Sequence, residues 1–230
     1  LQLGDERFHD AVRKFGFGER TGINLPGEIN GKVYLPHQWS KLSITRMAMG
    51  HEIGVTPLQM ATAMCAVANG GKLMMPQIVK DVANEDGSPT VTFPPREVRT
   101  VASPEGMRQV QMMLLDVCGP KGTASLARVH GFQVAGKTGT SQKLDENMRY
   151  TRDKYVVSFA GYLPAENPEF VAYVLLDEAK TPRGQNYGGL VAAPIFSRIA
   201  ERAARYLNLT PSAEALFGDV KVSKSGEVED

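Results

Sequence analysis

The residues of greatest chemical interest lie near the middle of the chain, in Gly136-Lys137-Thr138-Gly139-Thr140. A single ammonium group stands there between two glycines, with hydroxyl side chains after it and a mostly apolar run, residues 132–135, before it. Glycines let a ligand approach the backbone closely, whereas lysine and threonine donate hydrogen bonds to it. The stretch therefore predicts an open edge strand that binds an anionic or carbonyl-bearing partner.

The same stretch also matches a phosphate-binding loop. Residues 131–138 satisfy G-x-x-x-x-G-K-[ST], and the apolar run 171–178 ends in acids that could hold magnesium. A phosphate loop opens a helix, however, and the residues after Thr138 have no apolar helical period. The strand-like runs 156–162 and 170–176 are joined by a connector too short for the crossover that parallel strands require. We therefore expect an antiparallel hairpin, with a phosphate-loop nucleotidase as the weaker alternative.

Length, charge and composition argue against a nucleic-acid-binding protein, a membrane-spanning chain, a disulfide-rich domain and a metal protein. The chain has 230 residues, 42% of them hydrophobic, and a net charge of +1. It can bury a substantial core, while the balanced charge argues against nucleic acid as a partner. No apolar run reaches membrane-spanning length. Two distant cysteines, Cys65 and Cys118, and scattered histidines predict neither a disulfide framework nor a metal site, so no cofactor is expected.

Helix and strand signals divide the rest of the chain into short elements. The expected helix starts are Asp5 as a capping residue, Thr56-Pro57, Ser103-Pro104 and Pro194. Residues 77–98 contain Asp86-Gly87 and predict a peripheral hairpin. The polar segment 142–154 predicts an exposed loop between strands. The result is an α+β arrangement in which helices pack on an antiparallel sheet.

Further motifs follow one another along the chain. They are Phe15-Gly16-Phe17-Gly18, Thr21-Gly22-Ile23-Asn24-Leu25-Pro26-Gly27-Glu28, Ile53-Gly54-Val55-Thr56-Pro57, Phe159-Ala160-Gly161-Tyr162-Leu163-Pro164 and Tyr187-Gly188-Gly189. With Lys137-Thr138-Gly139 they resemble the C-terminal part of the transpeptidase domain of class B penicillin-binding proteins, of the division or elongation type. The resemblance implies a partial serine β-lactamase/D,D-peptidase-like fold over residues 1–209, with the lysine strand at one edge of the sheet. Residues 210–230 lose apolar content and predict a flexible C-terminal tail.

The resemblance also implies an activity. A class B enzyme uses a serine acyl-enzyme to cross-link peptidoglycan stem peptides that end in D-Ala-D-Ala, and it binds β-lactams. Lys137 would stabilise the substrate carboxylate and bias proton movement, and Thr138 would donate a hydrogen bond to that carboxylate. Gly139 would keep the strand surface clear, and the backbone N–H of Thr140 would form half of the oxyanion hole. The implied parent protein builds the cell wall during division or elongation, anchored by an N-terminal transmembrane helix at the extracytoplasmic (periplasmic) face of the bacterial membrane.

The chain departs from the family pattern in two motifs. It contains no S-x-x-K and no S-x-N, which carry the nucleophile and the second serine in related enzymes. We therefore expect the N-terminal half of the transpeptidase domain to be a missing partner, and we expect this chain alone to be inactive. A non-catalytic penicillin-sensor-like binding domain stays open as an alternative. Because only three strands of the implied sheet remain, we predict intermolecular strand pairing, or coverage by another chain, at residues 170–176.

Overall fold

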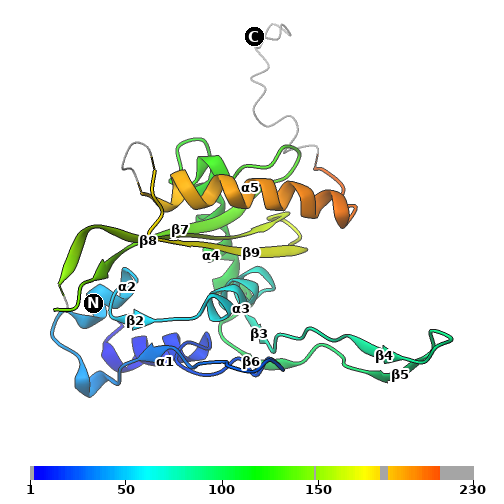
Figure 1. Cartoon of the computed structure of the whole chain (residues 1–230), viewed down its shortest axis with the longest axis horizontal. Helices are drawn as coiled ribbons and strands as arrows, with labels where there is room; N and C mark the ends of the chain where they lie inside the picture. Colours follow the sequence, from blue (N-terminus) through cyan, green and yellow to red (C-terminus); the bar gives the residue numbers. More distant parts are fainter. Residues whose placement is uncertain (1–2, 148, 182–185, 213–230) are drawn as a thin grey trace, which may run out of the picture. The chain divides into compact units, whose positions relative to one another are not determined.

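The two halves of the chain fold into separate units, one within Leu1–Gln109 and the other within Val110–Asp230. The computed structural model describes residues 3–147, 149–181 and 186–212 (Figure 1). Within these residues, no helix combines the length and the apolar character needed to cross a membrane. Residues 213–230, most of the expected tail, lie outside the described residues. Residues 210–212 stay with the second unit, since the Ser212 N–H donates to the Gly131 carbonyl at 3.0 Å.

The first unit consists of short helices and two-stranded antiparallel ribbons, in which β1 pairs with β2, β3 with β6, and β4 with β5. Its elements are α1 (Asp5–Lys14), β1 (Lys32–Val33), η1 (Pro36–Gln38), α2 (Ser43–Ala48), β2 (Ile53–Gly54), α3 (Pro57–Ala68), β3 (Lys72–Met74), β4 (Asp81–Ala83), β5 (Pro89–Thr92) and β6 (Glu97–Thr100). The β4–β5 hairpin turns at residues 84–88 and projects from the rest of this unit, which confirms the predicted peripheral hairpin (Figure 1).

The starts of helices α1 and α3 can be compared with those predicted from the sequence. The prediction that Asp5 caps the first helix is wrong, because the Phe8 N–H donates to the Gly4 carbonyl at 3.1 Å and Gly4 is the capping residue. Asp5 instead lies in the first turn, where its carboxylate faces the positive end of the helix dipole. The predicted start at Thr56-Pro57 is confirmed: the Thr56 hydroxyl accepts from the Gln59 N–H, and the Gln59 amide oxygen accepts from the Thr56 N–H.

The second unit is a three-stranded antiparallel sheet with a long helix on one face. Its strands are β7 (Ala135–Leu144), β8 (Tyr150–Leu163) and β9 (Phe170–Asp177), in the order β7–β8–β9. Helix α4 (Pro104–Cys118) leads into this unit, η2 (Ser125–Ala127) precedes β7, and α5 (Gly188–Tyr206) follows β9. Because a short connector joins β8 to β9, they form the predicted hairpin, with Phe159 opposite Val174. Among the described strands, the sheet order also leaves β7 at an edge, as predicted.

Two predictions about the second unit are wrong. The segment 142–154 is not a single loop, because β7 continues to Leu144, β8 begins at Tyr150, and Leu144 lies opposite Tyr150. A two-stranded extension can be polar on both faces, so its polarity misled the prediction. The last helix starts at Gly188, six residues before the predicted Pro194. Pro194 lies inside the helix, where its missing N–H removes one intrahelical hydrogen bond.

The core of the second unit lies between the sheet and α5, which runs across one face of it (Figure 1). The Phe159 ring on β8 meets the Phe196 ring on α5 edge to face, with centroids 4.8 Å apart. Small residues on the buried side of α5 let the helix approach the sheet closely; they are Ala192, Ala193, Ala200 and Ala204. Cys118, Ala127 and Val134 join the same cluster, so the segment between α4 and β7 is fixed by burial.

Candidate active site

The lysine of the predicted site lies on the edge strand β7, opposite Ala160 of β8. Its side chain is exposed, and its ammonium donates to the Thr138 carbonyl at 2.9 Å and approaches the Thr138 hydroxyl at 3.5 Å. Within the described part of the chain, Lys137 forms no ion pair with a carboxylate. An exposed cation beside a hydroxyl can therefore receive an anionic group.

A second lysine on the same strand is already paired. The Lys143 ammonium lies 2.8 Å from a Glu178 carboxylate oxygen and 3.0 Å from one of Asp177. Hydrogen bonds to Glu178 and then to Asp177 raise the pKa of Lys143, and the hydrogen bond from Lys143 lowers the pKa of Glu178. The two lysines of β7 thus differ in their surroundings: the Lys143 ammonium is paired with carboxylates, whereas the Lys137 ammonium stands beside the Thr138 hydroxyl.

The glycine before Lys137 is required by packing. A Cβ atom at Gly136 would collide with the Phe159 ring and would lie 2.6 Å from the Ala160 carbonyl oxygen. A Cβ atom at Gly139 would meet the Ser158 hydroxyl, which can rotate to another position. Gly136 therefore holds β7 against β8, and both glycines leave the strand without bulk beside Lys137. The predicted role of Gly139, a clear strand surface, is compatible with this contact.

The first turn of α5 rests directly on β7. The Gly188 N–H donates to the Thr140 hydroxyl oxygen at 3.1 Å, so Thr140 satisfies one of the unpaired N–H groups at the start of the helix. A Cβ atom at Gly188 would collide with the Ser158 and Gly139 carbonyl oxygens. Only glycine allows the helix to begin so close to the strand. The Thr140 hydroxyl proton is left available to another acceptor.

One residue of the site was not predicted from the sequence. Thr123, from the segment between α4 and η2, places its hydroxyl oxygen 3.4 Å from that of Thr138. A single threonine between Gly122 and Ala124 carries no periodic signal, so only the folded chain could place it there. The structure thus brings the Thr123 hydroxyl to the Thr138 hydroxyl, which lies near the Lys137 ammonium, while the Thr140 hydroxyl further along β7 contacts the start of α5.

The geometry of β7 contradicts the phosphate-loop alternative. Residues after Thr138 continue as a strand to Leu144 rather than opening a helix, and the neighbouring strand runs antiparallel. A phosphate loop would need a helix N-terminus at that point. The prediction of an edge strand, made from the glycine and threonine pattern, is the one that the fold confirms.

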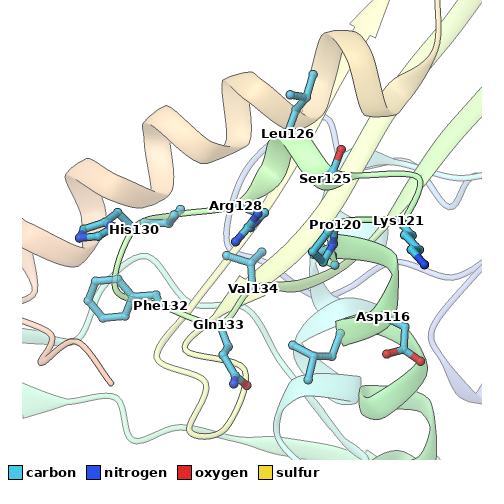
Figure 2. A pocket seen from close by; sticks show the side chains of 15 residues that line it. Asp116, Pro120, Lys121, Ser125, Leu126, Arg128, His130, Phe132, Gln133 and Val134 are labelled. Carbon is cyan, nitrogen blue, oxygen red and sulfur yellow. The ribbon is translucent and has the colours of Figure 1, made fainter. Parts of the chain in front are cut away.

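The second unit also contains a groove, which lies apart from Lys137. It has a volume of about 1110 Å³ and is lined by the C-terminal end of α4 and by parts of the segment 119–134 (Figure 2). Its walls mix apolar residues such as Leu126 and Val134 with the charged residues Asp116, Lys121 and Arg128 (Figure 2). None of the predicted site residues lines it. The groove is therefore a separate feature from the threonine cluster.

Two buried titratable groups of this unit are Cys118, at the end of α4, and Tyr162, on β8. Burial raises the pKa of the Cys118 thiol to about 12, so this cysteine is no nucleophile at neutral pH. Burial also raises the pKa of the Tyr162 hydroxyl to about 12. Among the described residues, the buried Tyr162 hydroxyl has no hydrogen-bond partner. Buried hydroxyls usually have a partner, either a protein group or an ordered water.

These two groups predict a loss of stability at alkaline pH. The unfolded chain releases their protons near 9.0 and 10.0, whereas the folded chain holds both until about 12. Their contribution is therefore complete below about pH 9 and is lost as the pH rises toward 12. The Cys118→Ala variant should show a slope of unfolding free energy against pH that is shallower by about 1.4 kcal/mol per pH unit near pH 10–11. Denaturant unfolding at stepped pH measures this slope, and measurement at pH 7 isolates the constant cost of the lost packing. An unchanged slope would contradict the prediction.

Known proteins with the same pattern identify the family. The family model of the penicillin binding protein transpeptidase domain matches residues 1–201. Penicillin-binding protein PbpB of Mycolicibacterium smegmatis is 37% identical over 206 residues, which cover 86% of this chain and 32% of that protein. Peptidoglycan D,D-transpeptidase FtsI of Escherichia coli is 31% identical over 213 residues, which cover 93% of this chain and 34% of that protein.

Solved structures agree with the sequence relatives. The apo form of penicillin binding protein 3 from Mycobacterium tuberculosis superposes with a TM-score of 0.82 at 35% identity, over 94% of this chain and 49% of that one. Its complex with ampicillin gives a TM-score of 0.79 at 35% identity, over 92% and 48%. The chain thus spans about a third of the length of the curated relatives and about half of the solved chains.

The fold is the penicillin-binding transpeptidase fold, with helices packed on an antiparallel sheet, as the motifs predicted. The chain belongs to the family of penicillin binding protein transpeptidase domains, and its relatives are class B penicillin-binding proteins.

Proposed function

We propose that residues 1–209 are the C-terminal part of the transpeptidase domain of a serine-type peptidoglycan D,D-transpeptidase. The observation that carries the proposal lies on β7, at the edge of the described antiparallel sheet: the exposed Lys137 ammonium stands beside the Thr138 hydroxyl, and Thr140 follows on the same strand. The relative from Escherichia coli is named for this activity. Membership of the family makes the same reaction the best-supported one here.

The proposed substrate is a stem peptide that ends in D-Ala-D-Ala. A serine attacks the carbonyl of the penultimate alanine, the terminal D-alanine leaves as an amine, and an amine of a neighbouring stem peptide then resolves the ester. Lys137 and the Thr138 hydroxyl would hold the terminal carboxylate, which is an acceptor-only group. The Thr140 backbone N–H would donate to the oxyanion that forms during attack. Gly139 would leave the strand open to the peptide.

β-Lactams are the second proposed class of ligand. Solved relatives from Mycobacterium tuberculosis are complexed with ampicillin and with aztreonam. These compounds carry an anionic group beside a strained acyl bond, so they would present the same charge to Lys137 and the same carbonyl to the nucleophile. The proposal therefore places β-lactams and the stem peptide at one site.

The rest of the transpeptidase domain must supply the nucleophile, since the sequence has neither S-x-x-K nor S-x-N. One observation supports a further part of the domain: β9 pairs only with β8 in the part of the chain that the structure describes. Intermolecular pairing at residues 170–176 stays a prediction for these residues taken alone.

The proposed biological setting follows from the reaction. Peptidoglycan is cross-linked outside the cytoplasm, so the parent protein would act at the extracytoplasmic face of the bacterial membrane, held there by an anchor. Its role would be cell-wall synthesis during division or elongation. These statements concern the whole protein, of which the described residues would form one part.

The test compares residues 1–230 with a protein that also carries the rest of the domain. Both are incubated with benzylpenicillin and analysed by intact mass. We expect an adduct on the longer protein alone; an adduct on residues 1–230 would show that the chain has its own nucleophile. The longer protein is then given a stem-peptide analogue, and release of D-alanine is expected. An adduct without D-alanine release would favour the penicillin-sensor-like alternative, and no adduct on either protein would refute the proposed function.

A further inference from the structure

Thr123 is held in place although it lies between secondary-structure elements. On one side the Gly122 N–H donates to the Gly119 carbonyl at 2.9 Å, and on the other the Ala124 N–H donates to the Val117 carbonyl at 2.9 Å. Ala124 is completely buried in the core of the second unit. A Cβ atom at Gly189 would collide with the Thr123 carbonyl oxygen, so the first turn of α5 rests on this residue. The position of its hydroxyl is therefore set by the fold.

The hydrogen bonds around β7 show what the Thr123 hydroxyl can do. A lysine ammonium only donates, so the Thr138 oxygen is the acceptor in its contact with Lys137 at 3.5 Å. The Thr140 oxygen likewise accepts from the Gly188 N–H. If the Thr123 hydroxyl also donates to the Thr138 oxygen, across their 3.4 Å separation, both lone pairs of Thr138 are occupied. The Thr138 proton is then left to donate to a ligand.

We propose that Thr123 is a positioning residue for recognition of the substrate's carboxylate. Its hydroxyl donates to the Thr138 oxygen, which directs the Thr138 proton toward the anion that Lys137 attracts. An O–H donor beside an ammonium fits a carboxylate, which only accepts hydrogen bonds, and the pair does not fit a neutral amide equally well. This inference rests on the proposed function, because it assigns Thr123 to the same site.

The test uses the protein that carries the whole domain and a matched pair of acyl donors. One is a penicillin with its free carboxylate, and the other is the same penicillin with that carboxylate converted to a neutral amide. The Thr123→Val variant keeps the shape of the side chain and removes the hydroxyl. We expect the acylation rate constant for the carboxylate form to fall about fivefold to tenfold, the size of one hydrogen bond, and that for the amide to change by less than about twofold.

Two further variants make the result specific. Thr123→Ser retains the hydroxyl and should restore discrimination between the two penicillins. Ser125→Ala removes a hydroxyl two residues further along, in η2, and should leave both rate constants unchanged. Equal losses for the two penicillins in Thr123→Val would show a purely structural role, and no loss would also overturn the inference. If the unaltered protein forms no adduct with the carboxylate form, the proposed function itself fails, and this inference falls with it.

Discussion

Replacing Lys137 by methionine should lower the rate of acylation by benzylpenicillin about 10²–10³-fold in the protein that carries the whole domain. The ammonium is exposed on the edge strand, has no carboxylate partner among the described residues, and lies beside the Thr138 hydroxyl. It is therefore the one cation of β7 that is free to meet the ligand's anionic group. Methionine keeps most of the side chain's length, so the loss would report the missing charge. Stopped-flow acylation kinetics provide the measurement.

Lys143→Met is the matched control for this prediction. Lys143 lies on the same strand, but its ammonium is bound to Asp177 and Glu178 at 3.0 Å and 2.8 Å. Surface ion pairs of this kind contribute little to stability, and the Lys143 ammonium donates its hydrogen bonds to these two carboxylates. The acylation rate of Lys143→Met should stay within about twofold of the unaltered protein. A similar loss in both variants would mean that general positive charge, and not the position of Lys137, supports acylation.

The second large effect is expected at Gly188. An alanine there would force a Cβ atom against the carbonyl oxygens of Ser158 and Gly139, and these backbone atoms cannot rotate away. The first turn of α5 would have to move from the strand, which breaks the hydrogen bond from the Gly188 N–H to Thr140. We expect Gly188→Ala to reduce the unfolding free energy by about 2–4 kcal/mol, with a parallel loss of acylation. Chemical denaturation measures the first effect.

Gly106→Ala is the matched control, because the same substitution is expected to leave the unfolding free energy unchanged or to increase it. Gly106 lies in the first turn of α4, and a Cβ atom there meets only the Ser103 hydroxyl, at 3.3 Å. Because alanine is favoured over glycine in a helix, this variant should be neutral or more stable by up to about 1 kcal/mol. If Gly188→Ala were as stable as Gly106→Ala, the close approach of α5 to β7 would be wrong.

The sequence predicted those features that local chemistry decides. The short connector between the runs 156–162 and 170–176 could only make an antiparallel hairpin, and β8 and β9 form one. Threonine followed by proline marked the start of α3 because a capping hydroxyl and a fixed φ both favour a helix there. The glycines around Lys137 likewise indicated an edge strand, and β7 lies at an edge among the described strands.

Features decided by distant contacts escaped prediction. Pro194 is a strong start signal, yet α5 begins at Gly188 because glycine there fits against β7, a contact that no local pattern encodes. The Thr123 hydroxyl meets Thr138 only because the segment after α4 is anchored in the core. The polar ribbon around Leu144 and Tyr150 was mistaken for a loop because pairing, and not burial, holds it together.

The contact between Thr140 and α5 has an evolutionary consequence. The Thr140 hydroxyl oxygen accepts the hydrogen bond from the first N–H of the helix, and Thr140 is also a residue of the proposed ligand site. If a bacterial population were selected for weaker binding of an anionic inhibitor, loss of the Thr140 hydroxyl would also remove the hydrogen bond that holds the start of α5 on the sheet. Selection for weaker inhibitor binding and selection for stable folding therefore act in opposite directions at position 140. Serine is the substitution that changes the side chain and keeps the hydroxyl.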